Sequence, residues 1–190
     1  AGAARAIELT RKSPEPDNYK PVVLWITQSS VYGLPAGAVE SAQEILEARG
    51  GRDPFGALGV ALLGGARALT RPRGPSEELR RCAAALCDPG VGERHLELRA
   101  LSGWFAAEAA RRDGDDAAAD RAVGEALRDA EKLDHVWLQL ALLTLRGRIR
   151  PDEGGSRRVD ALVGRTAAGL AAKEDREQLL RAWHPSGEGD

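Results

Sequence analysis

The stretch DGDDAAADRAVGEAL, residues 113–127, carries the pattern that decides the fold. It begins with a glycine-containing turn, and small or apolar residues follow that glycine at five, twelve and thirteen positions. The same spacing occurs three times, at intervals of 41 and 40 residues, after Gly33, Gly74 and Gly114. Apolar residues seven positions apart lie near one face of a helix, and a period of about 40 residues is typical of stacked helical hairpins.

This repeat predicts an all-α fold, a right-handed superhelical array of about four antiparallel hairpins with a C-terminal capping helix. Residues 1–17 are expected to form an N-terminal segment with a short helix and a linker. The predicted hairpins are 18–49, 53–88, 93–133 and 134–172, and residues 173–190 are predicted to be the capping helix and a flexible tail. Ser76-Glu77-Glu78-Leu79 has the pattern of a capped helix start. Turns are expected at 113–115 and 151–155.

The third hairpin resembles a tetratricopeptide repeat. Gly114-Asp115 occupies the family's turn, Ala119 its small residue, and Ala126-Leu127 its Ala-Leu pair. Ala107 matches the small residue that lets the two helices approach. The sequence departs from the family at its leading tryptophan position, which holds Gly103, with Trp104 one place later.

The resemblance implies a protein-interaction array whose first helices line a concave groove for a peptide or a partner's helix. The groove positions are then an aromatic and apolar platform beside charged residues: Arg71, Leu101, Trp104, Glu108, Arg111 and Arg112. Arginines can grip a partner's carboxylate with two hydrogen bonds. The alternative is that these arginines form a solvated helix end that is favourable to the helix dipole.

A strand–helix–strand unit near residues 21–65 is the rival interpretation, and it would indicate a small α/β nucleotide-binding or enzyme domain. Its strands would be the apolar runs 22–27 and 59–65. The second run is rich in alanine and leucine and poor in β-branched residues, and two parallel strands alone would be unstable.

Residues that could carry chemistry do not combine into a catalytic or metal-binding motif. The glycines at 56, 59, 64 and 65 lack the dinucleotide-binding spacing, so they are expected either to permit close helix contact or to reflect composition alone. Asp113-Gly114-Asp115-Asp116 lacks the later ligands of a calcium loop and is expected to be a solvated turn with capping acids. Cys82 and Cys87 point apart on a helix and are interpreted as buried thiols, and the histidines are dispersed: His95, His135 and His184. We therefore expect no enzyme activity, no metal and no cofactor.

Composition narrows the setting in which this chain works. The net charge of −2 offers no basic excess for nucleic acid, and no apolar run reaches the ~20 residues that cross a bilayer. Free cysteines and the absence of a signal peptide indicate the cytoplasm. Arginine dominates the 27 basic residues, which suggests a GC-rich bacterium, and the lack of methionine suggests a piece of a larger regulatory protein. The expected partner is a protein, a peptide or an adjoining domain of the same polypeptide.

Overall fold

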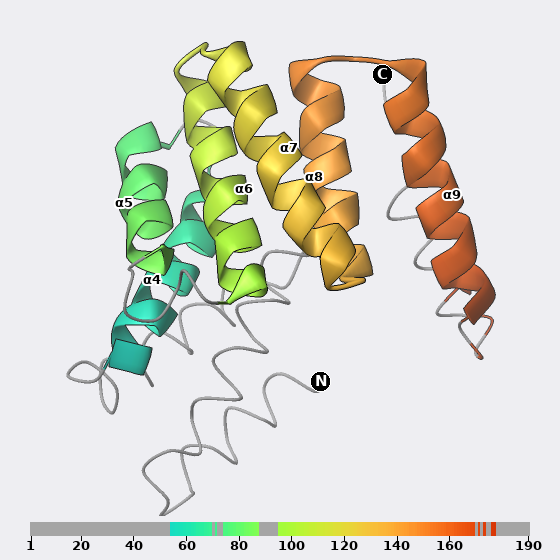
Figure 1. Ribbon diagram of the computed structural model, residues 1–190, viewed down its shortest axis with the longest axis horizontal. Coiled ribbons are helices and arrows are strands. Elements are labelled where there is room, and N and C mark those ends of the chain that lie inside the picture. The colour runs from blue at the N-terminus through green and yellow to red at the C-terminus, as the bar shows by residue number, and fades with distance from the viewer. Residues whose placement is uncertain are drawn as a thin grey trace, which may run out of the picture.

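The computed structural model describes residues 54–69, 71, 74–87 and 95–169, with positions 171, 173, 176 and 177. This part of the chain is all-α and contains no strand, so the predicted fold class is confirmed for it. Its helices lie side by side in chain order (Figure 1). They are α4 (Pro54–Leu69), α5 (Ser76–Leu86), α6 (Leu96–Arg112), α7 (Asp116–Lys132), α8 (Val136–Ile149) and α9 (Glu153–Gly169).

Each helix packs against the next, and α6 also contacts both α4 and α8. Helices α4 and α5 fall inside the segment predicted as 53–88, α6 and α7 inside 93–133, and α8 and α9 inside 134–172. The predicted segments 1–17 and 18–49 lie outside the described residues, as does most of 173–190. Contact with sequence neighbours is the arrangement expected of stacked hairpins.

The rival strand–helix–strand interpretation is wrong at its second strand, because residues 59–65 lie within α4. The first proposed strand, 22–27, is outside the described residues. Apolar residues of α4 recur at helical spacing, and Leu58, Leu62 and Ala66 are all buried. Alanine and leucine favour a helix over a strand, so local propensity and burial agree here.

Two kinds of helix alternate along the chain. In α6 and α8 burial extends around the helix, and residues 138–143 of α8 are buried without interruption. Helices α5 and α7 bury a single stripe; in α5 its members are Leu79, Cys82, Ala83 and Leu86. A helix buried on all sides lies inside a packed structure, whereas a one-sided stripe belongs to an outer helix. Helices α6 and α8 are therefore inner helices, and α5 and α7 form an outer layer.

Glycine in α4 allows an inner helix contact, as the sequence predicted. A Cβ atom at Gly65 would lie 2.1 Å from the Phe105 ring of α6, and Phe105 is fully buried. The ring therefore packs directly against the α4 backbone. No nucleotide-binding role is needed to explain this glycine.

The turns agree with the sequence in one hairpin and differ in two. Gly114 has a φ of +79°, which favours glycine, and the Asp115 carboxylate accepts a hydrogen bond from Ala118 N at 2.9 Å, as a capping acid does. Ser76 does not cap α5, because it is the first residue of the helix and Pro75 occupies the N-cap position without a side-chain cap bond. The Ser76 hydroxyl instead donates to Asp113 Oδ1 at 2.6 Å. The predicted turn 151–155 is shorter than expected, since α9 begins at Glu153 and Asp152 accepts a hydrogen bond from Gly155 N.

Candidate partner-binding surface

Leu101 and Trp104, which the sequence placed on an open groove, are buried side chains of α6. Their exposed fractions are 4% and 8%. They lie on an inner helix that contacts α5 and α7 as well as α4 and α8. The expected aromatic platform is therefore not open to a peptide in this structure. Trp137, at the start of α8, is 39% exposed.

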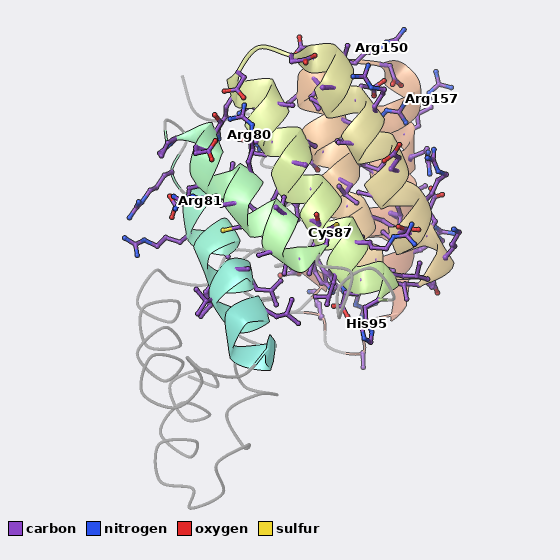
Figure 2. All side chains as sticks on the ribbon, turned by 60° about the vertical axis from the view of Figure 1, so that its left-hand side comes forward. Arg80, Arg81, Cys87, His95, Arg150 and Arg157 are labelled. Atoms are coloured by element: carbon purple, nitrogen blue, oxygen red, sulfur yellow. The ribbon has the colours of Figure 1, made fainter. Side chains whose placement is uncertain are left out.

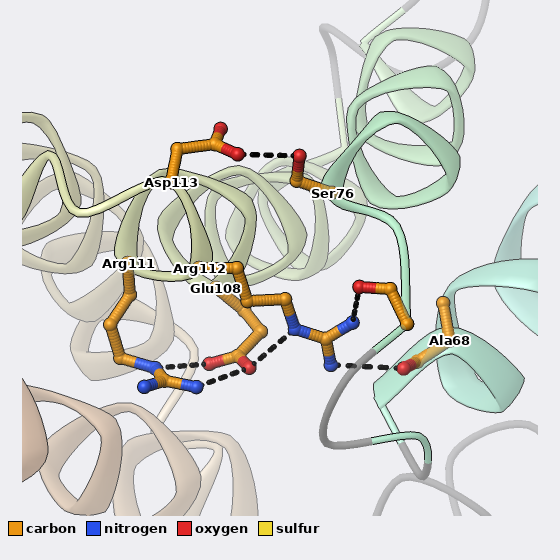
Figure 3. Close-up of polar contacts among 7 residues, drawn as sticks. Ala68, Ser76, Glu108, Arg111, Arg112 and Asp113 are labelled. Carbon is orange, nitrogen blue, oxygen red and sulfur yellow. Dashed lines mark hydrogen bonds and ion pairs between the residues drawn. The ribbon is translucent and has the colours of Figure 1, made fainter.

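Glu108 is also buried, and it joins two arginines of its own helix (Figure 3). Arg111 donates from Nε and Nη2 to the two carboxylate oxygens, both at 2.9 Å, and Arg112 Nε donates to Oε1 at 2.8 Å. Burial alone would raise the pKa of Glu108, but the hydrogen bonds from Arg111 and Arg112 outweigh it and lower that pKa. The hydrogen bonds to Glu108 also raise the pKa of Arg111, because they stabilise its charged form. Glu108 therefore holds both guanidinium groups in place.

Arg112 connects this ion cluster to the preceding hairpin. Its side chain is only 6% exposed, and its Nη2 and Nη1 donate to Ala68 O at 3.0 Å and Gly74 O at 3.1 Å. Ala68 lies in the last turn of α4, where carbonyls lack helical partners and the helix dipole is negative. Arg112 thus closes the C-terminal end of α4. Its buried N–H groups join one hairpin to the preceding one. The sequence did not predict this role for Arg112.

Arg71 and Arg111 are the members of the predicted site that reach solvent. Arg71 is exposed in the loop between α4 and α5, and the Arg111 side chain is 32% exposed. Backbone bonds from Arg71 N to Ala68 O and from Gly74 N to Arg71 O shape that loop. A Cβ atom at Gly74 would meet both Arg112 Nη1 and Arg71 Cβ at 3.2 Å, so these side chains surround the glycine. Arg71, Arg111 and Arg112 stand against Glu108 and against Asp116, whose negative charge acts on Arg111, so a positive excess of one charge remains. Such a surface can accept a partner's carboxylate.

The remaining candidates occupy separate places. Cys82 is buried, and burial raises the pKa of its thiol, as expected of a packing residue. Cys87, labelled in Figure 2, is exposed, so the prediction of two buried thiols is wrong for it. Helix α5 ends at Leu86, and its packed stripe does not extend to Cys87. His95 and His135 stand before the first residues of α6 and α8, and His184 lies outside the described residues. Within the described residues, no group of three or more His, Cys, Asp or Glu side chains is arranged to hold a metal ion.

Ion pairs between residues far apart in the sequence were not anticipated. Asp113 pairs with Arg80 of α5, Asp120 with Arg146 at 3.0 Å, and Glu131 with Arg158. The two residues of each pair are between 26 and 33 positions apart, so the spacing of charges along one helix cannot predict these pairs. By contrast, Glu108 is three residues from Arg111 and four from Arg112, a spacing that indicates ion pairs on one helix. Arg81, Arg150 and Arg157 lie on the outside of the stack (Figure 2).

Comparison with protein-family models, with curated proteins and with solved structures finds no match to this chain. None of the helices in the described ranges is both long enough and apolar enough to cross a membrane.

Proposed function

We propose that this chain is a non-enzymatic protein-interaction array, a tetratricopeptide-like segment of a larger bacterial regulatory protein that works in the cytoplasm. Its partner is a protein, a peptide or an adjoining domain of the same polypeptide. The observation that supports this most directly is the packing of consecutive helices, with inner helices enclosed between outer ones. Arrays of this kind bind partners along their surface because each hairpin needs only its neighbours for stability.

The position of Arg71 and Arg111 supports a contact with an acidic group. Arg71 is exposed and the Arg111 side chain is one-third exposed, while Arg112 and Glu108 are held by hydrogen bonds. A partner carboxylate can therefore meet Arg111 in an orientation that Glu108 already fixes, which reduces the entropy lost on binding. Binding here does not require the buried side chains of Leu101 or Trp104 to become exposed.

Fluorescence anisotropy with labelled acidic peptides tests this proposal. One set carries a free C-terminal carboxylate, and the matched set is amidated, with Asn and Gln in place of Asp and Glu. The double variant Arg71→Ala with Arg111→Ala is expected to weaken binding of the acidic set by about tenfold or more. The matched control is Arg121→Ala with Arg128→Ala, two exposed arginines of α7.

Equal affinities for the site variant and the control variant would contradict the assignment of Arg71 and Arg111. If neither the peptides nor the natural flanking chain associates in size-exclusion experiments, the proposed binding role fails. Turnover of any compound in a metabolite panel by the purified chain would overturn the non-enzymatic assignment. These three outcomes are separable because they measure the site, the binding and the chemistry independently.

A further inference from the structure

His135 occupies the N-cap position of α8 and uses its side chain as the cap. Its Nδ1 atom accepts a hydrogen bond from Leu138 N at 3.3 Å. Cap residues are usually Ser, Thr, Asp or Asn, whose oxygens accept at any pH near neutrality. An imidazole nitrogen can accept only while it carries no proton. This cap therefore depends on the protonation state of the histidine.

The other ring nitrogen of His135 faces a different helix. Nε2 lies 3.7 Å from Glu97 Oε1, in the first turn of α6. With Nδ1 accepting, the proton of the neutral ring is on Nε2, directed toward this carboxylate. The nearby Glu97 carboxylate is the main cause that raises the pKa of His135, against the opposing effect of burial. One side chain thus joins the start of α8 to the start of α6, two helices that pack together.

The charges around His135 leave Glu97 as its main electrostatic partner. On α7, Asp129 lies 2.9 Å from Arg99 of α6 and 3.6 Å from Lys132, and Glu131 pairs with Arg158 of α9. The nearest charged residue on α8 itself, Arg146, pairs with Asp120. Asp134, in the turn before α8, and Arg165, on α9, are both exposed.

We propose that His135 is a pH-responsive cap. In its neutral form it closes the first turn of α8, and its protonation opens that turn while strengthening the contact with Glu97 of α6. A proton on Nδ1 faces the Leu138 N–H, which is also a donor, so the cap bond is lost. The positive ring is then held by the Glu97 carboxylate, against the unfavourable dipole at the start of α8. Half-exposed Trp137 lies in the turn that opens, so acidification changes the surface presented there.

NMR of the full chain tests this proposal at two atoms. Imidazole ¹⁵N shifts of His135, assigned by their loss in His135→Asn, should show the tautomer with the proton on Nε2 above the pKa. The hydrogen-exchange protection of the Leu138 amide, corrected for intrinsic rates, should fall about fivefold as pH decreases through the His135 titration between about 8 and 5. Glu97→Gln should lower the pKa of His135.

Two controls make the result specific. The Ala118 amide is also a first-turn donor, but it is bonded to the Asp115 carboxylate, so its protection should stay constant over the same range. In His135→Asn the side-chain oxygen can cap without titrating, and the Leu138 amide should then keep its protection at both ends of the range. A neutral tautomer with the proton on Nδ1 would overturn the proposal. Leu138 protection that does not change with pH in the unaltered chain would overturn it as well.

Discussion

Gly103 of α6 faces Ala126 of α7 so closely that a Cβ atom on the glycine would lie 2.8 Å from the alanine Cβ. Ala126 is buried, and the same added atom would lie 3.4 Å from the carbonyl oxygen of Ala122. The Ala122 carbonyl oxygen is part of the α7 backbone, and the Ala126 Cβ is bonded directly to that backbone. Neither atom can therefore move away without moving the helix. This contact explains why a residue without a side chain stands at position 103.

Replacing Gly103 with alanine should destabilise the chain by about 1–2 kcal/mol. The added methyl group forces α6 and α7 apart, and this cost exceeds the gain in helix propensity of up to ~1 kcal/mol. Gly124→Ala is the matched control, because nothing lies within 4 Å of a Cβ atom at that position of α7. It should stabilise by about 0.5–1 kcal/mol. Urea unfolding measures both variants, and a shift in the same direction for the two would show that the contact is not tight.

Ala119→Leu should destabilise by about 1–3 kcal/mol through overpacking, because Ala119 is fully buried. The loss should extend to neighbouring hairpins, since stacked repeats share their interfaces. Ala117→Leu, at an exposed position of the same helix, should change stability by less than about 0.5 kcal/mol. Equal urea midpoints for these variants would mean that the wrong face of α7 has been assigned to the core.

Arg112→Met should cost about 3 kcal/mol or more. The substitution leaves the buried Glu108 carboxylate without one of its partners and removes the donors for Ala68 O and Gly74 O. Arg111→Met should cost less, because Arg111 is one-third exposed and water can replace it. Hydrogen exchange of α4 amides should increase in the Arg112 variant. An unchanged α4 would contradict the role of Arg112 in closing that helix.

Acid should destabilise the chain through Glu108. A carboxyl group whose pKa is lowered in the folded state contributes stability above its unfolded pKa, near 4.5, and loses it as pH falls through the lower folded value. Glu108→Gln should remove this dependence below about pH 4.5, and urea midpoints measured across that range check it. His135 has the opposite effect on stability. Because its pKa is raised in the folded state, its protonated form contributes stability at low pH, and this contribution is lost as pH rises through the folded-state pKa.

Much of the local structure follows from the sequence. The repeat glycine and its capping acid place the turn at Gly114 and the start of α7, because backbone conformation and first-turn hydrogen bonds depend on adjacent residues. Glu108 with Arg111 and Arg112 is recognisable from the helical spacing of the charges. The one-sided stripe of α5 indicates an outer helix for the same reason, since periodicity reports which face is covered.

Only the tertiary structure decided which candidate residues reach solvent. Leu101 and Trp104 sit on α6, whose burial on all sides depends on the helices that contact it. Arg112 could have been a solvated helix end, but it instead bonds carbonyls 38 and 44 residues away. Spacing along one helix carries no information about such partners, because chain folding brings them together through helix packing. The sequence determined the helices and the turn at Gly114, while the packing of inner against outer helices determined which arginines reach solvent.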